Sequence, residues 1–203
     1  MIKLYHSPQS RSIRPRWMLE ETGVAYDVVP IDLQAGDQKK PEFLKINPNG
    51  AVPALVDGEL RLFESAAICQ YLADRFPEKR LAPPLGSAAR AYYYQWIHFA
   101  MSTLEPPLIT IFLHTVMKPE SERLPQVVGP AREQLRAALG VLEQALAGRS
   151  FIVGDEFTAA DVMVGSTLAW AQMIGVLDAS TPVTAAYLGR LMGRPAFQRA
   201  MAG

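Results

Sequence analysis

The chain has little cysteine, no surplus charge of one sign and no long apolar run. Its 203 residues include one cysteine, Cys69, so an intrachain disulfide is excluded and a reducing compartment is favoured. The 20 basic and 20 acidic side chains cancel, which leaves no positive field for a nucleic-acid backbone or an anionic membrane. No segment approaches the ~18 apolar residues of a membrane span, and residues 1–8 lack the apolar core of a signal peptide. We therefore expect a cytoplasmic protein with no nucleic-acid and no membrane partner.

The hydrophobic period changes near residue 80, which indicates two domains. Before it, short alternating runs predict strands over residues 2–5, 26–30, 54–56 and 61–63, with helices over 11–21, 41–46 and 64–76. After it, the pattern predicts helices over residues 87–116, 129–147, 159–174 and 183–192 and beyond Pro195, with a kink or break at Pro106 and Pro107. The order strand, helix, strand, helix, hairpin, helix describes an α/β thioredoxin-like domain. We expect this domain at residues 1–77, a linker at 78–86 and an all-α helical-bundle domain at 87–203.

The loop after the first predicted strand is where a thioredoxin-like scaffold places its reactive group. The start of a helix offers unpaired amides and a partial positive charge, both of which stabilise a thiolate. This loop carries Ser7, Ser10 and Ser12 and basic side chains, but no cysteine. If thiol chemistry takes place here, the sulfur arrives with a substrate. The serines could equally be helix caps and nothing more.

Two further segments fit a small peptide ligand. Val52-Pro53 precedes a strand, where a cis bond would leave the Val52 amide and carbonyl free to pair with a peptide. Glu64-Ser65 opens a helix, where the hydroxyl and backbone amides can hold a carboxylate while the glutamate takes an ammonium group.

At these residues the chain resembles the cytosolic glutathione transferase superfamily, and the resemblance covers essentially its whole length. The most specific pieces are Asn47-Pro48 through Leu55, then Glu64-Ser65, in this order and spacing. The run Phe157 to Asp161 is similar to the family's capping box and hydrophobic staple, in which Asp161 reaches back to the Thr158 amide. The ending is similar to that of bacterial members, and the loop is similar to that of the serine-type, theta- or zeta-like classes.

The resemblance implies that Ser10, or alternatively Ser12, donates a hydrogen bond to the glutathione sulfur and favours its thiolate, with support from Arg14. It also implies roles for residues that bind glutathione itself. Those residues are Val52, Pro53 with a cis bond, Glu64 and Ser65, together with Gln38, Lys39 or Lys40 for the glycine carboxylate.

The second substrate, a small hydrophobic electrophile, is expected against the helical domain. The residues expected to line its site are His6, Ser7, Phe99, Ser102, Thr103 and Trp170. Glutathione is then a co-substrate, with no tightly bound cofactor. No metal is expected, because His98 and His114 lack a second ligand at i+4. Cys69 follows apolar residues in a helix and is expected to be buried. The family's two-fold dimers make a homodimer the default.

The leading interpretation is a glutathione transferase that conjugates electrophiles and could also reduce peroxides. One alternative is a maleylacetoacetate-type cis-trans isomerase, although Ser10-Arg11-Ser12 lacks the two adjacent serines followed by cysteine and serine of that class. A second alternative is a noncatalytic binding protein with the same fold, since fold does not determine function.

Overall fold

The structure is a computed structural model that describes residues 1–177 and 180–202. It divides into two compact units, and each is described by itself. One unit contains Met1–Ala82 and the segment from Met192 onward, and the other contains Pro83–Leu191. The division after Ala82 falls inside the predicted linker. The final segment belongs to the first unit, whereas the sequence analysis assigned it to the helical domain.

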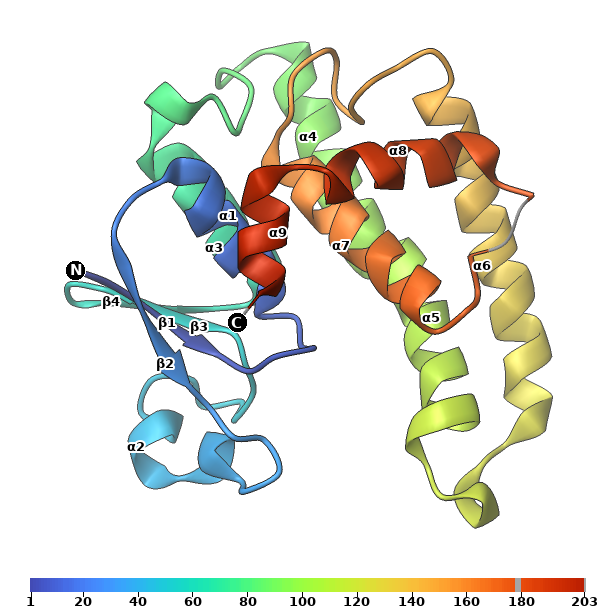
Figure 1. The fold of residues 1–203 in the computed structure, drawn as a ribbon, viewed down its shortest axis with the longest axis horizontal. Coiled ribbons are helices and arrows are strands. Elements are labelled where there is room, and N and C mark those ends of the chain that lie inside the picture. Colours follow the sequence, from blue (N-terminus) through green and yellow to red (C-terminus); the bar gives the residue numbers. More distant parts are fainter. Residues whose placement is uncertain (178–179, 203) are drawn as a thin grey trace. The chain divides into compact units, whose positions relative to one another are not determined.

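The first unit is built on a mixed sheet of four strands in the order β2-β1-β3-β4 (Figure 1). The strands are β1 (Ile2–His6), β2 (Tyr26–Pro30), β3 (Ala54–Asp57) and β4 (Leu60–Phe63). Its helices are α1 (Ile13–Thr22), α2 (Pro41–Leu44), α3 (Ser65–Arg75) and α9 (Pro195–Met201). Strand β1 pairs parallel with β2 and antiparallel with β3, while β3 and β4 form an antiparallel hairpin. This arrangement confirms the predicted thioredoxin-like sheet.

The two faces of the sheet pack against different helices. Tyr5 and Ala54 face α2, where the Tyr5 and Phe43 rings meet edge to face with centroids 5.7 Å apart. Because side chains alternate along a strand, Leu4 and His6 point to the opposite face, toward α1. That alternation brings the end of β1 next to the start of α1.

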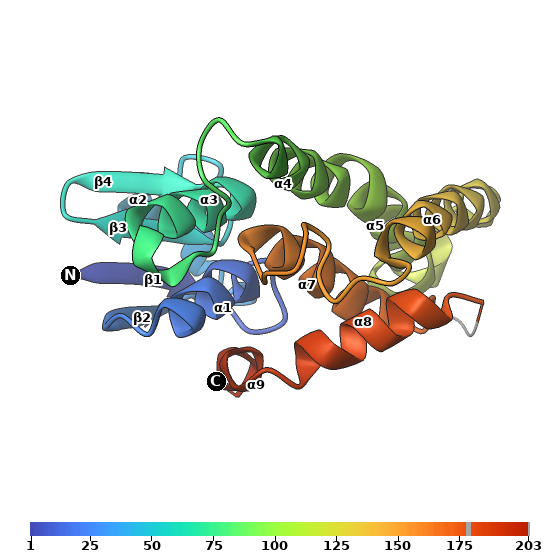
Figure 2. The same ribbon diagram turned by 90° about the horizontal axis from the view of Figure 1, so that it is seen from above.

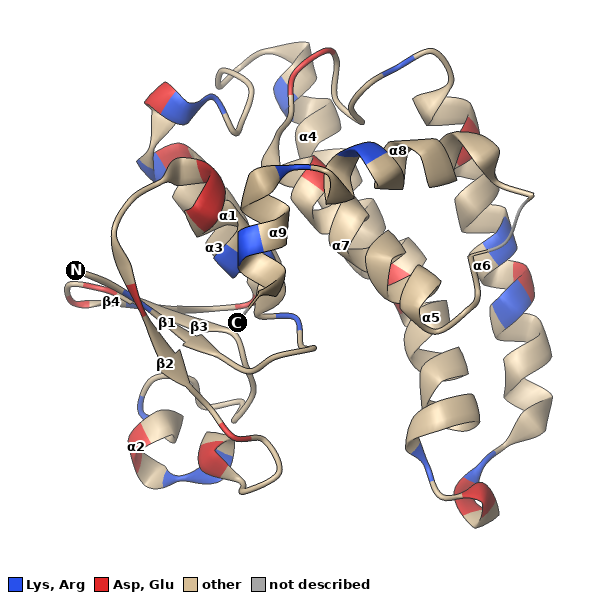
Figure 3. Cartoon of the chain, in the orientation of Figure 1, with Lys and Arg blue, Asp and Glu red and all other residues tan. Residues whose placement is uncertain are grey.

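Helix α9 returns to the first unit because it has both apolar and ionic partners on α1. The Trp17 and Phe197 rings pack edge to face at 4.8 Å. Arg194 donates to both carboxylate oxygens of Glu21 at 2.7 and 2.8 Å, and Arg199 Nε donates to Glu20 at 2.7 Å. The opposite charges of the two neighbouring helices are visible in Figure 3. Neither contact can be inferred from local periodicity, since the partners are more than 170 residues apart.

The second unit is helical throughout its regular structure, as predicted. Its helices are α4 (Ala88–Phe99), α5 (Glu105–Phe112), α6 (Pro125–Leu146), α7 (Ala159–Met173) and α8 (Pro182–Met192). Helix α5 lies beside α6 and α4 beside α7 (Figures 1 and 2). No helix of residues 1–177 and 180–202 is long and apolar enough to cross a membrane.

Prolines affect the second unit in two ways. Pro106 and Pro107 lie in the first turn of α5, where backbone N–H groups need no helical partner, and a π-helical turn, Ala100–Leu104, precedes them. The regular α-helix is therefore interrupted next to Pro106 and Pro107, where the sequence predicts a kink or break. Helix α6 starts at Pro125, earlier than predicted, and continues through Pro130. Its buried stripe, which includes Leu135, Leu139 and Leu142, outweighs the hydrogen bond that this proline removes.

Candidate active site

The loop between β1 and α1 brings the predicted serines together. Ser10 Oγ lies 2.7 Å from Ser12 Oγ and 2.7 Å from the Ser7 carbonyl oxygen, and it accepts the Ser12 N–H at 3.2 Å. Ser12 occupies the position before α1, but its side chain makes no capping bond to the helix. Its hydroxyl points back to the end of β1, where it accepts the Ser7 N–H at 3.1 Å.

Burial separates the two candidate hydroxyls. Ser12 is 0% exposed, whereas Ser10 is only half-buried. A ligand sulfur that approaches the first turn of α1 can therefore reach Ser10 while Ser12 stays behind it. The helix start adds a partial positive charge at this point.

His6 and Ser7, two of the residues expected to line the electrophile site, lie in the interior of the first unit. The His6 side chain is 3% exposed, and its two ring nitrogens have partners: Nδ1 lies 2.7 Å from Ser12 Oγ and Nε2 lies 3.3 Å from Arg16 Nη1. Ser7 is also buried, and its main chain holds the two neighbouring serines. Both residues therefore form hydrogen bonds within the loop between β1 and α1 that carries Ser7, Ser10 and Ser12, which we call the serine loop.

Val52 lies two residues before β3, outside the strand ladder. The register with β1 begins at Ala54, so the Val52 N–H and C=O are not used by the sheet. The Val52-Pro53 peptide bond is cis, as the sequence analysis predicted. The Val52 side chain packs against the cluster of Ile31, Phe43 and Ala54. The main chain of Val52 is thereby held at the edge of a packed cluster.

Glu64 and Ser65 lie at the start of α3. Glu64 is exposed and has a φ of 72°, a conformation that non-glycine residues rarely adopt and that is found at ligand sites. Ser65 is buried, and its Oγ accepts a hydrogen bond of 3.2 Å from Arg14 Nη1. Arg14 is itself 3% exposed, so a buried guanidinium lies directly beneath the start of this helix.

The three residues proposed for the glycine carboxylate have different partners. Lys39 Nζ donates to the Gly50 carbonyl at 3.0 Å, which brings its ammonium group close to the turn before Val52. Gly50 has a φ of 58°, and a Cβ there would lie 2.9 Å from the Gln38 main-chain oxygen, so glycine is required at this position. Lys40 instead pairs with Asp37 at 2.7 Å, and its hydrogen bond holds the pKa of Asp37 below its usual range. Gln38 donates to the Leu33 carbonyl.

The remaining residues expected at the electrophile site belong to the second unit. Phe99 ends α4, and Ser102 and Thr103 are exposed on the π-helical turn that follows. Trp170 lies on α7, half-buried, with its ring 5.6 Å from that of Phe112. The π-helical turn packs against α7 within this unit. Turns of this kind are frequent at functional sites.

Cys69 is 0% exposed on α3, as predicted, and burial raises the pKa of its thiol to about 12. At neutral pH such a thiol holds far less thiolate than an exposed one. We expect a small thiol reagent to label the native chain at least about 100-fold more slowly than the same chain unfolded in guanidinium. Rapid one-to-one labelling of the native protein would contradict the burial. Slow labelling would also show that the protein's own thiol does not disturb a titration of bound glutathione.

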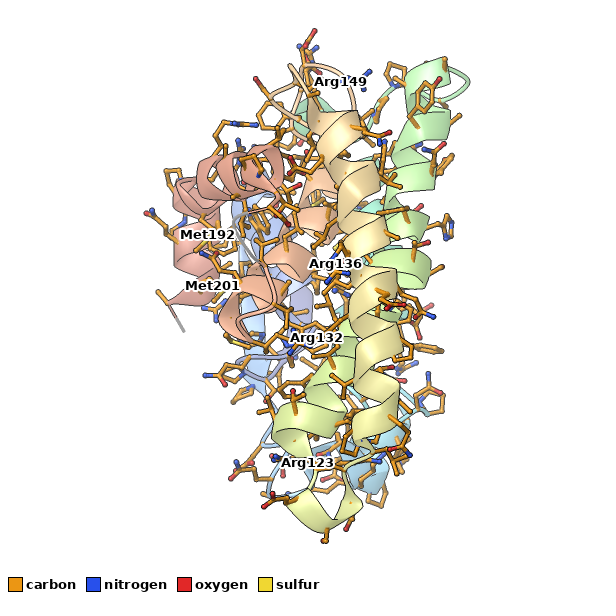
Figure 4. All side chains as sticks on the ribbon, turned by 90° about the vertical axis from the view of Figure 1, so that its right-hand side faces the viewer. Arg123, Arg132, Arg136, Arg149, Met192 and Met201 are labelled. Carbon is orange, nitrogen blue, oxygen red and sulfur yellow. The ribbon has the colours of Figure 1, made fainter. Side chains whose placement is uncertain are left out.

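A cavity in the second unit lies apart from every predicted site residue. Arg132 and Arg136, one turn apart on α6, line it together with Leu135, Leu139, Val176, Ser180 and Thr181 (Figure 4). Among residues 1–177 and 180–202, no group of three His, Cys, Asp or Glu side chains is placed to hold a metal ion.

Three features of the site were not predicted from the sequence. They are the contact of His6 with Ser12, the hydrogen bond from Arg14 to Ser65, and the different partners of Lys39 and Lys40. The positive φ of Gly50 could not be predicted from the sequence, because the glycine itself is the one residue there that indicates it. One feature of the sequence does point to the contact of Lys39 with Gly50. Residues 47–50 are Asn, Pro, Asn and Gly, which predict a turn, and a long side chain can reach the carbonyl groups of a turn.

The chain is similar to known proteins over both of its units. Residues 1–74 match the family model for the glutathione S-transferase N-terminal domain, and residues 119–190 match that for the C-terminal domain. Glutathione S-transferase 3 of Zea mays is 35% identical over 99% of this chain and 93% of its own length. A zeta-class glutathione S-transferase of Euphorbia esula is 38% identical over 80% of this chain and 72% of its own. The structure of a sphingomonad glutathione S-transferase complexed with glutathione is 32% identical with a TM-score of 0.86, over 98% of this chain and 96% of that one. The chain therefore belongs to the glutathione S-transferase family.

Proposed function

We propose that this chain is a serine-type glutathione transferase in which the Ser10 hydroxyl stabilises the thiolate of bound glutathione. The observation that carries the proposal is the half-exposed Ser10 hydroxyl at the start of α1, backed by the buried Ser12 hydroxyl 2.7 Å away. Family membership supports glutathione as the co-substrate.

The chemistry follows from the electrostatics of the loop. A hydrogen bond from Ser10 Oγ and the positive end of α1 both favour the charged sulfur over the neutral thiol, so they lower the pKa of the bound thiol. The thiol proton leaves to solvent. The thiolate then displaces a halide, which departs with the electron pair of the broken bond, or it adds to an activated double bond, whose π electrons move to the other carbon and take up a proton from solvent. Serine acts as a hydrogen-bond donor and forms no covalent bond.

The cysteinyl main chain and the γ-glutamyl group of glutathione each have binding partners in the first unit. The free main chain of Val52 pairs with the cysteinyl unit, beside the cis bond to Pro53. Glu64 takes the γ-glutamyl ammonium group, and Ser65 with the first amides of α3 takes its carboxylate. The buried Arg14 adds positive charge beneath Ser65, which we regard as its role in place of support for the sulfur.

Lys39 is our choice for the glycine carboxylate. We expect Lys39→Met to weaken glutathione binding about two- to fivefold at low salt, since the side chain is exposed and the pair is screened. The matched control is Lys40→Met, which removes a neighbouring charge already paired with Asp37 and should change the Kd less. Calorimetric titration of the two variants with glutathione checks this, and a larger loss in Lys40→Met would assign the contact to Lys40.

We further propose a small hydrophobic electrophile as second substrate, at a site to which Phe99, Ser102, Thr103 and Trp170 contribute. The exposed π-helical turn and the half-buried aromatic rings support this choice. A cytoplasmic homodimer is proposed from the single buried cysteine and from the family resemblance. Sedimentation at micromolar concentration tests the dimer.

The decisive experiment is an ultraviolet difference titration of glutathione on the wild-type protein across pH. We expect the bound thiol to ionise at least about one pH unit below its free value, which is tenfold in the ionisation constant. S-methyl glutathione, which has no thiol, serves as the matched ligand and should give no such signal. If glutathione binds without ionising, the noncatalytic alternative becomes the conclusion, and if it does not bind, the proposal fails.

A second candidate function is the cis-trans isomerisation of a maleyl-type acid. The similarity to a zeta-class relative favours it. In that reaction glutathione adds to the double bond and leaves again, so it is not consumed. Isomerisation without loss of free thiol would support the isomerase, and stoichiometric loss of thiol with an aryl halide would support conjugation.

A further inference from the structure

The His6 ring lies directly behind the loop between β1 and α1, in contact with the Ser12 hydroxyl. Strand β1 ends at His6, and Ser12, directly before α1, lies one helical turn from Arg16 on α1. The ring is held between them, with Nδ1 2.7 Å from Ser12 Oγ and Nε2 3.3 Å from Arg16 Nη1.

Counting donors and acceptors assigns the proton on this ring. An arginine guanidinium has donors only, so the Nε2 atom that faces Arg16 must accept, and the ring proton is on Nδ1. The Nδ1–H then donates to Ser12 Oγ. The Ser7 N–H donates to the same oxygen at 3.1 Å.

Both acceptor positions of the Ser12 hydroxyl are therefore occupied, and its own proton can only be donated. Two acceptors are in reach, the Ser7 carbonyl at 3.0 Å and Ser10 Oγ at 2.7 Å. In the contact between the two serines, Ser12 must be the donor. The Ser10 proton is then directed away from Ser12, toward the Ser7 carbonyl at 2.7 Å or toward a ligand.

We propose that His6 is a positioning residue that sets the direction of the chain His6 to Ser12 to Ser10, so that Ser10 offers its proton to the sulfur. This inference rests on the proposed role of Ser10. Without the Nδ1–H, Ser12 can rotate and accept from Ser10, and the sulfur then faces an oxygen lone pair. A donor that itself receives a hydrogen bond is also polarised and donates more strongly.

The first test needs no glutathione. Nitrogen-15 NMR of the imidazole groups distinguishes a protonated Nδ1 from a protonated Nε2, and the His6 signals are identified by their loss in His6→Asn. His98 and His114 are the chain's other histidines and serve as references. We expect the Nδ1–H form of the neutral ring. An Nε2–H ring would reverse the hydrogen-bond direction and overturn the proposal.

The second test compares His6→Asn with His6→Gln. The amide nitrogen of asparagine can stand where Nδ1 stands and donate to Ser12, whereas the amide of glutamine reaches the position of Nε2 and keeps only the contact with Arg16. We expect the bound thiol's pKa and kcat/KM with an aryl halide to stay within about twofold of wild type in His6→Asn. In His6→Gln we expect kcat/KM below neutral pH to fall about three- to tenfold, with the thiol pKa raised by up to about one unit.

The outcomes separate this inference from the proposed function. If the wild type ionises glutathione and His6→Gln behaves like His6→Asn, the role of His6 is refuted alone. A loss in both variants that matches a fall in their unfolding midpoints would mean that His6 is merely structural, which also refutes the role. A wild type that does not ionise glutathione refutes the proposed function and the role of His6 with it, whatever tautomer NMR finds.

Discussion

Glutathione bound to a Ser10→Ala variant is expected to ionise near the range of a free thiol, and kcat/KM at neutral pH is expected to fall about 100- to 1,000-fold. The alanine removes the half-exposed donor at the start of α1 and leaves the sulfur with the helix dipole alone. The rate rises with pH as the thiolate forms, so the rising limb of the pH profile should move to higher pH. Glutathione affinity should change far less, because the hydrogen bond acts mainly on the charged form of the sulfur.

Two variants are the controls for this result. Ser10→Thr keeps a hydroxyl and should retain a lowered thiol pKa. Ser12→Ala removes a buried hydroxyl that accepts from Ser7 and His6, so it should lower the stability by about 1–3 kcal/mol and raise the thiol pKa only in part. If Ser12→Ala abolishes the ionisation and Ser10→Ala preserves it, the assignment of the two serines is reversed.

An Asp161→Ala variant should lose about 3–5 kcal/mol of unfolding free energy, the largest stability effect that we predict. Asp161 is 0% exposed at the start of α7. Its Oδ1 accepts from the Ile152 N–H at 2.8 Å and from the Tyr187 hydroxyl at 2.7 Å, and its Oδ2 accepts from the Thr158 N–H at 2.8 Å. Alanine would leave these buried donors without an acceptor, and urea denaturation should show a lower midpoint.

Tyr187→Phe is the matched control for Asp161, because it deletes one of these donors together with its hydrogen bond. Asp161 Oδ1 still accepts from the Ile152 N–H in this variant, and no buried donor is left without an acceptor, so we expect a loss of only about 1 kcal/mol. Equal losses in the two variants would contradict the view that Asp161 acts through several donors at once. Neither variant touches the serine loop.

Much of the fold could be predicted because it rests on local patterns. The alternation in β1, Gly23 directly after α1 and Gly58 between β3 and β4 are short-range signals, and both glycines have a positive φ. The capping box of Thr158 and Asp161 was equally readable, since its partners are three residues apart. Helix α6 could not be bounded in the same way, because tertiary burial of its apolar stripe overrides Pro130.

The residue types of the site were also predicted, and the resemblance to the family supplied their expected roles. The resemblance prefers Ser10 to Ser12, whereas the residue types alone do not separate them, because both are hydroxyls near the start of one helix. Arg14 could have served either the sulfur or the carboxylate for the same reason.

By itself, the sequence determined the thioredoxin-like and helical parts, the absence of a protein thiol from the serine loop, and the order of the glutathione-binding motifs. These properties depend on composition and on neighbours within a few residues. Only the tertiary structure decided that Ser12 is covered while Ser10 is reachable, that Arg14 lies beneath Ser65, that Lys39 reaches Gly50, and that α9 packs on α1. The physical reason is that burial and hydrogen-bond partners are set by segments distant in the chain, and these meet only after the sheet and its helices have packed.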